Sequence, residues 1–306
     1  MLAPFPLGVV SDEIDQDLEH VCQVAVDLGL QVLELNTLWG KPADRLEPDE
    51  VTRVHDLLRR YHLRIDAVST LAFKALELST EPNLRHSPQF AEHMAAIQRA
   101  SGIARSLADV AITPAVRIFA FRRVPMSGLG NPSPILPDGG GIPDSMLLRI
   151  VQGLRLACDL ARDEGVRLLL ENVRSCWNNT GVNTARIVEL TNRAELSILW
   201  DPANDFVSCG LPYATGYAAV KPYMAAVHCK DARIVDPAGG LTAWMPIGQG
   251  GADMPGQIAT LLDDGFRGPV LLETHWRGDG LSREASSRQS FAGLQAAIAQ
   301  RQTGAH

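Results

Sequence analysis

The sequence is poor in several features that mark particular classes of protein. Only five of its 306 residues are cysteines, and no two of them have the C-x-x-C spacing. An odd number of scattered cysteines argues against a disulfide framework and a cysteine zinc site, and is typical of a reducing compartment. The chain carries no positive charge before Lys41, so the basic first region of a secretory signal is missing. We therefore expect a cytoplasmic protein.

Long apolar runs and an excess of positive charge are missing too. No stretch approaches the roughly 18 to 20 apolar residues that a membrane-spanning helix needs, so no membrane partner is expected. Lysine and arginine number 28 against 35 aspartates and glutamates, which gives a net charge of −7. Because affinity for phosphate backbones comes largely from Lys and Arg, no nucleic-acid partner is expected either. With 46% hydrophobic and 21% charged residues, the composition is that of a globular protein with a full core.

Eight short apolar segments alternate with longer helical patterns along the chain. Most of them are apolar on both faces, which is typical of buried parallel strands. The helical patterns between them are punctuated by Pro48, Pro143 and Pro255 at starts and by glycines such as Gly29 and Gly165 at ends. The predicted strands are Leu7–Val10, Val32–Leu35, Arg64–Ser69, Val116–Phe121, Arg167–Glu171, Leu196–Trp200, Ala225–His228 and Val270–Glu273.

A strand–helix unit of about 38 residues, repeated eight times, is typical of a (β/α)8 TIM barrel. We therefore predict an α/β protein with a single TIM-barrel domain over residues 1–306 and a parallel eight-stranded core. A doubly wound open sheet is the main alternative, because strand count alone does not exclude it. The segment Pro125–Ile142 holds four prolines and five glycines and follows the fourth strand. It is a candidate lid loop, with a surface excursion of no function as the alternative.

The last four predicted strands each end in a residue that can bind a metal ion, namely Glu171, Asp201, His228 and Glu273. In a TIM barrel, chemistry sits at the carboxyl ends of the strands. Any one of these residues has an ordinary explanation, such as a helix N-cap or a solvated loop charge. Three buried carboxylates close together, however, need a cation between them. Three oxygen ligands and one imidazole suit one divalent ion, Mn2+, Co2+ or Mg2+, with Zn2+ as a further alternative.

At these positions the chain resembles the xylose-isomerase-like superfamily of sugar phosphate isomerases and epimerases, over nearly its whole length. The resemblance implies that Glu171, Asp201, His228 and Glu273 bind one divalent metal. It also assigns the roles of catalytic acid and base to Glu171 and Glu273. The matching pieces are Ser11-Asp12-Glu13-Ile14, Glu34–Lys41, Leu170-Glu171-Asn172, Trp200–Asn204, His228–Asp231, Pro246–Gly250 and Leu272–Trp276.

The activity that the resemblance implies is sugar isomerisation or epimerisation, by proton transfer next to a carbonyl through a metal-stabilised enediolate. Two positions depart from the family pattern. Many members have a His where this chain has Asn204, and epimerases often have an Arg six residues after the metal-binding His, whereas Arg233 here comes five after it. The intervening Lys230-Asp231 makes the motif more like the dehydratase branches. A dehydratase or lyase acting on a keto-sugar or keto-inositol is therefore the first alternative.

Two further functional classes are alternatives for a protein with this barrel. Abasic-site endonucleases bind three zinc ions with many histidines and need basic loops that face DNA. The net charge of −7 and the few histidines near the predicted rim argue against that class. A sugar-binding barrel without catalysis is the other alternative, and the four retained ligands argue against it.

Five residues are candidates for binding a small sugar or polyol: Lys230, His275, Asn204, Arg122 and Trp39. Lys230 suits an oxyanion or a hydroxyl, and Arg122 suits a phosphate or carboxylate. His275 alternates to the same side as Glu273, where it either binds substrate or supports another residue. Trp39, together with Phe121, suits an apolar wall against a sugar face, although each is also a core candidate. The identity of the sugar, its phosphorylation and the formation of a homo-oligomer stay open.

Overall fold

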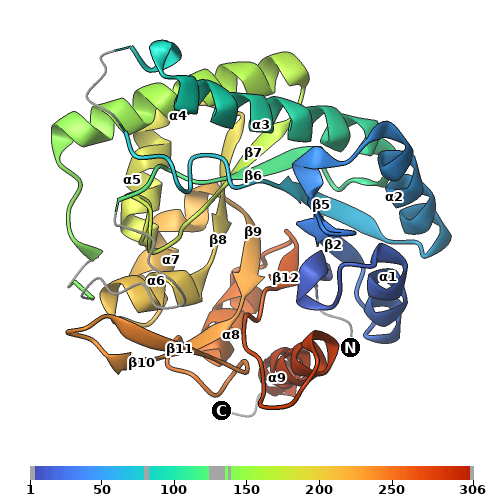
Figure 1. Ribbon diagram of the computed structural model, residues 1–306. Helices are drawn as coiled ribbons and strands as arrows, with labels where there is room; N and C mark the ends of the chain where they lie inside the picture. Colours follow the sequence, from blue (N-terminus) through green and yellow to red (C-terminus); the bar gives the residue numbers. More distant parts are fainter. Residues whose placement is uncertain (1–3, 79–82, 124–134, 137–138, 304–306) are drawn as a thin grey trace.

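The structure is a computed structural model that describes residues 4–78, 83–123, 135–136 and 139–303. Eight parallel strands form a closed barrel in the order β1-β12-β9-β8-β7-β6-β5-β2. Figure 1 shows these strands at the centre, with the long helices packed around them. The predicted α/β TIM barrel is therefore confirmed. Its strands are β1 (Leu7–Val10), β2 (Val32–Leu35), β5 (Arg64–Ser69), β6 (Ala115–Ile118), β7 (Arg167–Glu171), β8 (Leu196–Trp200), β9 (Met224–Cys229) and β12 (Val270–Leu272).

The helices begin and end at residues suited to those positions. Pro48 opens α2, where the side chains of Glu47 and Glu50 bond back to the backbone as a capping box. Gly165 ends α4 with a φ of 70°, which a glycine adopts without strain. The helices are α1 (Leu18–Asp27), α2 (Pro48–Arg60), α3 (Pro88–Ser106), α4 (Asp144–Glu164), α5 (Gly181–Thr191), α6 (Pro202–Cys209), α7 (Ala214–Val220), α8 (Met254–Asp263) and α9 (Arg283–Thr303).

Two small antiparallel ribbons extend from the carboxyl ends of barrel strands. The first pairs β3 (Thr37–Leu38) with β4 (Lys41–Pro42) and follows β2. The second pairs β10 (Asp231–Asp236) with β11 (Leu241–Met245) and follows β9 directly. This second ribbon was not predicted. It continues from the strand that carries His228, so it lies at the end of the barrel where chemistry is expected.

The barrel interior has an apolar floor. It consists of one buried side chain from each of seven barrel strands: Val32, Ala67, Ala115, Leu169, Leu199, Ala226 and Leu271. On the eighth strand, Gly8 lies in register with Val32 and Leu271. Because side chains alternate along a strand, the residue two positions further along each chain segment points into the same interior. On the seven strands that contribute to the floor these next residues are all polar, whereas on β1 the next residue is Val10.

Some expectations differ from the structure or fall outside it. The fourth strand was predicted to run to Phe121, but β6 ends at Ile118. Most of the candidate lid Pro125–Ile142 lies outside the described residues, so the lid stays a prediction, as does the single-domain boundary. Among the described residues, none of the helices is long and apolar enough to span a membrane.

Candidate metal centre and active site

Seven polar side chains fill the layer of the interior that follows the apolar floor. All of them are buried at 5% exposure or less. They come from seven different strands or strand ends, so the barrel brings together residues that lie far apart in the sequence. They are Glu34, Ser69, Arg117, Glu171, Asp201, His228 and Glu273.

Four of these residues are the predicted metal ligands, and the structure places them together. Ligand atoms of Glu171, Asp201, His228 and Glu273 all lie within 4.8 Å of one another. Glu171 ends β7 and His228 lies near the end of β9, while Asp201 and Glu273 directly follow β8 and β12. Asp201 also caps α6, because its Oδ1 accepts a hydrogen bond from the backbone N–H of Asn204 at 2.8 Å. The parallel strands therefore deliver three carboxylates and one imidazole to one point.

His228 is held so that one ring nitrogen faces the cluster. Its Nε2 lies 2.8 Å from Oε2 of Glu34. Burial alone raises the pKa of Glu34, but Arg117 and His228 outweigh burial and lower it, so Glu34 is ionised and can only accept. Nε2 therefore carries the proton. The other nitrogen, Nδ1, is buried without a hydrogen-bond partner and lies 3.3 Å from Glu273 and 3.7 Å from Glu171.

Arg117 contacts the cluster from strand β6. One guanidinium nitrogen, Nη1, lies 3.0 Å from Oε1 of Glu34, 3.2 Å from Oε2 of Glu171 and 3.4 Å from Oε1 of Glu273. The second oxygen of each glutamate lies near Nδ1 of His228. This oxygen is Oε1 in Glu171 and Oε2 in Glu273. Each candidate catalytic carboxylate is thus held by Arg117 at one oxygen and presents the other oxygen to the cluster.

Lys230 is the second buried cation of the site. Its Nζ donates to Oδ2 of Asp201 at 2.6 Å and to Oε2 of Glu273. It also lies 5.3 Å from the ring centroid of Trp244 on β11. Burial alone lowers the pKa of Lys230, but Asp201 and Glu273 outweigh burial and raise it. Lys230 is therefore a fixed positive charge.

The charges of this layer leave room for one divalent cation. Glu34, Glu171, Asp201 and Glu273 supply four negative charges, and Arg117 and Lys230 supply two positive ones. Burial and the neighbouring Glu273 and Glu171 raise the pKa of Asp201, although Lys230 partly offsets them. Glu34 and Glu273 outweigh burial and raise the pKa of His228 well above its ordinary value, so its imidazole is a third positive charge, which a divalent cation bound at Nδ1 would replace. The unpartnered Nδ1 atom and the oxygen-rich donor set both fit such an ion.

The model of one protein family matches residues 22–297 of the chain, and its description is "xylose isomerase-like TIM barrel". The chain belongs to this family. No curated protein matches the sequence. The match covers both the barrel strands from β2 onward and all four clustered residues.

Solved structures of other xylose isomerase-like barrels share the fold. A xylose isomerase domain protein from Planctomyces limnophilus is 17% identical, with 99% of this chain and 98% of that chain covered and a TM-score of 0.67. D-psicose 3-epimerase from Clostridium cellulolyticum H10, solved with D-tagatose, is 15% identical, with 97% and 99% covered and a TM-score of 0.67. The probable 3-DHS dehydratase AsbF from Bacillus anthracis is 17% identical, with 94% and 97% covered and a TM-score of 0.66.

Of the predicted substrate residues, three lie at the cluster of this xylose isomerase-like barrel. Lys230 contacts two of its carboxylates, as described above. Asn204 donates from Nδ2 to Oε1 of Glu171 at 3.2 Å and to Oδ2 of Asp201 at 3.0 Å. Asn204 therefore orients the proposed ligands. Nε2 of His275 lies 3.7 Å from Oε2 of Glu273.

The other two predicted substrate residues have their contacts elsewhere. Arg122 pairs with the exposed side chain of Glu77 at 2.7 Å. Trp39 lies under the guanidinium of Arg53, which is 4.6 Å from its ring centroid. Phe121 is fully buried and stacks on Phe73 with ring centroids 4.6 Å apart, so it belongs to the core and not to a sugar-binding wall.

Three buried charged residues of the site were missed by sequence analysis. Arg117 and Glu34 lie inside strands, whereas every residue predicted for the site lies at or after the end of a predicted strand. Glu13 lies in the short turn after β1, and its carboxylate accepts hydrogen bonds from His275 and Arg277. The signal that identifies Arg117 and Glu34 is a charged residue two positions after an apolar one in a strand that is otherwise apolar.

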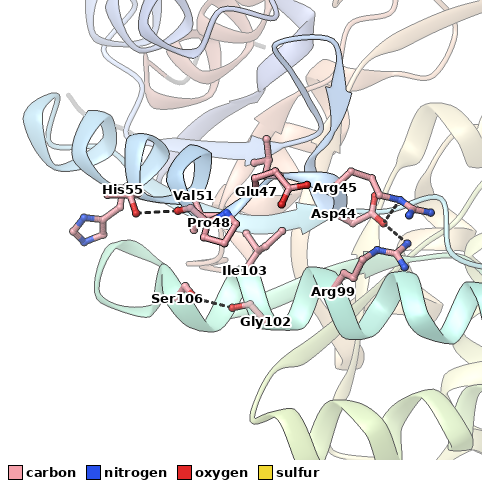
Figure 2. A pocket seen from close by; sticks show the side chains of 12 residues that line it. Asp44, Arg45, Glu47, Pro48, Val51, His55, Arg99, Gly102, Ile103 and Ser106 are labelled. Atoms are coloured by element: carbon pink, nitrogen blue, oxygen red, sulfur yellow. Dashed lines mark hydrogen bonds and ion pairs between the residues drawn. The ribbon is translucent and has the colours of Figure 1, made fainter.

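A separate groove of about 670 Å³ lies outside the barrel, between α2 and α3 (Figure 2). It shares no residue with the cluster. Three of its charged residues pair with one another, since Asp44 lies 2.9 Å from Arg99 and 3.6 Å from Arg45.

Proposed function

We propose that the protein is a divalent-metal-dependent sugar isomerase or epimerase that transfers a proton at a carbon next to a carbonyl. The observation that carries the proposal is the placement of Glu171 and Glu273 in one four-ligand cluster, each with an oxygen toward its centre. Glu171, Asp201, His228 and Glu273 would hold the ion, with Mn2+, Co2+ or Mg2+ best suited to the donor set. Such an ion acts as a Lewis acid that polarises a sugar carbonyl and stabilises negative charge on its oxygen.

Glu171 and Glu273 are both held in the ionised form, which a general base needs. Burial and mutual repulsion raise the pKa of Glu171, but Arg117 and His228 outweigh them and lower it. Burial also raises the pKa of Glu273, and Lys230, His275 and His228 together bring it well below its usual range. Both carboxylates are thus ionised and able to accept a proton from carbon. Because they come from β7 and β12 and flank the cluster, one can remove the proton and the other can return it.

Lys230 supports the same step as a fixed hydrogen-bond donor. Its ammonium lies between Asp201 and Glu273, beside the carboxylate that takes the proton. As negative charge grows on the sugar oxygen, a nearby donor that is already in place stabilises it without reorganisation. Lys230 would therefore bind the oxygen that becomes negative.

A dehydratase acting on a keto-sugar or keto-inositol is the second candidate. Lys230 in the His-x-Lys-Asp motif favours it, because an ammonium group beside Glu273 can also assist the departure of a β-hydroxyl. The fold similarity to a probable 3-DHS dehydratase is consistent with it. The two activities share the first proton abstraction. An isomerase or epimerase then returns a proton to carbon, whereas a dehydratase loses the β-hydroxyl as water.

The test is proton exchange in D2O. Protein saturated with Mn2+ is incubated with D-fructose, D-allulose, D-tagatose and 3-DHS, and products are analysed by NMR and mass spectrometry. We expect carbon-bound deuterium in an isomer of the sugar, whereas a dehydratase forms an unsaturated product that has lost water.

Glu171→Gln and Glu273→Gln test the two carboxylates at saturating metal. Each is expected to lower turnover by about 10²- to 10⁴-fold, the usual cost of losing a general base. Glu77→Gln, at an exposed glutamate that pairs with Arg122, is the control and should keep full activity. Near-normal turnover in both site variants, or no exchange with any of the four compounds, contradicts the proposal.

A further inference from the structure

Glu13 is a buried carboxylate beside the proposed site, to which the proposed mechanism gives no role. It lies in the short 3-10 helix Ser11–Glu13 that follows β1, and its side chain is 5% exposed. Its Oε1 lies 2.8 Å from Nδ1 of His275, and both of its oxygens lie 3.3 Å from the backbone nitrogen of His275. Its Oε2 also accepts a hydrogen bond from Arg277 at 3.0 Å.

The charge on Glu13 decides which nitrogen of His275 carries the bonded proton. Burial alone raises the pKa of Glu13, but His275 and Arg277 outweigh burial and lower it. An ionised carboxylate can only accept hydrogen bonds, so Nδ1 of His275 is the donor. The hydrogen bond at Nδ1 then fixes the orientation of the ring, and Nε2 points away from Glu13.

Nε2 of His275 faces the reactive side of the cluster. It lies 3.7 Å from Oε2 of Glu273, the oxygen that Lys230 also contacts. The imidazole stands edge-on to Trp244, with ring centroids 5.3 Å apart, and is 40% exposed, so it borders open space. The backbone of His275 has a φ of 50°, an unfavourable conformation for a non-glycine residue that its surroundings must hold.

We propose that Glu13 is a positioning residue: it orients His275 so that Nε2 binds a substrate hydroxyl next to the carbon at which Glu273 transfers a proton. This inference rests on the proposed function. It assigns to the substrate a hydroxyl vicinal to the reacting carbon, on the side of β1 and β12. Carboxylates that orient metal-binding imidazoles typically change affinity or activity by about 10- to 100-fold, and we expect an effect of the same size at His275.

The direct test is the NMR spectrum of the imidazole groups in Mg2+-loaded protein labelled with 15N-histidine. The Nδ1 proton of His275 is assigned by its loss in His275→Gln. We expect a slowly exchanging, strongly deshielded Nδ1 proton in the wild type that disappears in Glu13→Leu and persists in Glu13→Gln, since an amide oxygen still accepts the bond. Arg277→Met removes the other partner of Glu13 and should leave the signal in place.

A double-mutant cycle then separates positioning from loop packing. Glu13→Leu and His275→Gln should each lower kcat/KM for the reactive sugar by about 10- to 100-fold, and the double variant should lose no more than either alone, because Glu13 acts through His275. Glu13→Gln and Arg277→Met should stay within threefold of the wild type. Additive losses, or an Nδ1 signal unchanged in Glu13→Leu, overturn the inference. A wild type without any exchange activity contradicts the proposed function instead, and the NMR result is independent of it.

Discussion

Asp66 is a buried acid at the end of the barrel opposite the candidate site. It belongs to β5 and lines a hollow of about 420 Å³, together with Arg167, Leu196 and Met224, the first residues of three other strands. Its Oδ2 is buried without a hydrogen-bond partner. Burial, and to a smaller extent the negative charge of Glu34, raises the pKa of Asp66 to about 7. Folding therefore favours the protonated form.

This raised pKa predicts how stability depends on pH. Between pH 4 and pH 7 the unfolded chain has lost the Asp66 proton while the folded chain retains it, so the free energy of unfolding falls as pH rises. From pH 5 to pH 8 the loss due to Asp66 is on the order of 3 kcal/mol. Asp66→Asn has no proton to lose, so it should gain stability over the wild type by that amount across this range. Urea unfolding of both proteins with a chelator present measures it, and parallel pH profiles would contradict it.

At the residue scale, sequence analysis located the four clustered residues but not the charges around them. Glu171, Asp201, His228 and Glu273 each interrupt an apolar run at its end, and that pattern is visible without a structure. Arg117 lies within Ala115–Ile118 and looks like an ordinary strand residue until the barrel closes and its guanidinium meets three carboxylates. Such a contact joins strands that are far apart in sequence, so spacing cannot predict it.

Among the secondary-structure elements, Asp231 links a ribbon and a loop that lie beside the site. Its carboxylate accepts hydrogen bonds from the backbone N–H groups of Ala232, Gly248, Gly250 and Ala252, at 2.9 to 3.2 Å. A side chain at Gly250 would place its Cβ 2.1 Å from Oδ1 of Asp231, so only glycine fits there. Asp231 thus fixes the loop 246–252 against the ribbon β10–β11, directly after Lys230.

Removing this carboxylate should destabilise the protein. Asp231→Ala leaves several buried N–H groups without an acceptor, at a cost of about 3 kcal/mol in the free energy of unfolding. Asp236→Ala, at an exposed position of the same ribbon, should change it by less than about 0.5 kcal/mol. Urea unfolding at pH 7 compares the two variants. Equal, small effects would show that Asp231 does not hold the loop.

The barrel strands were predictable because buried parallel strands are short apolar runs between glycine, proline and polar residues. The bounds of β1, β2, β5, β7 and β8 match the prediction. The fourth strand was predicted too long, because Phe119–Phe121 are apolar as well. Phe121 instead has a φ of 62° and joins Phe73 and Phe90 in an aromatic cluster outside the strand. Hydrophobicity marks burial, and it does not distinguish a strand from a packed turn.

At the scale of the whole molecule, the barrel separates an apolar floor from a layer of buried charges. The seven floor residues fill the interior, and the polar layer follows at the carboxyl ends of the strands. Because the four clustered residues come together only in the folded chain, ion binding should stabilise that chain by mass action. The fold and this layer together support a metal site at the carboxyl ends of the strands.

Titration calorimetry of chelator-treated protein with Mn2+ measures ion binding at this site. We predict one ion per chain, bound more than about 100-fold more weakly by Asp201→Asn, a larger loss than outer partners of a metal site usually cause. Asp205→Asn is the matched control. Asp205 is buried in α6, the helix that Asp201 caps, and it accepts a hydrogen bond from Gly181 outside the cluster. This control variant should bind the ion like the wild type. No bound ion in the wild type, or equal affinity in wild type and Asp201→Asn, would show that these four residues are not a metal site.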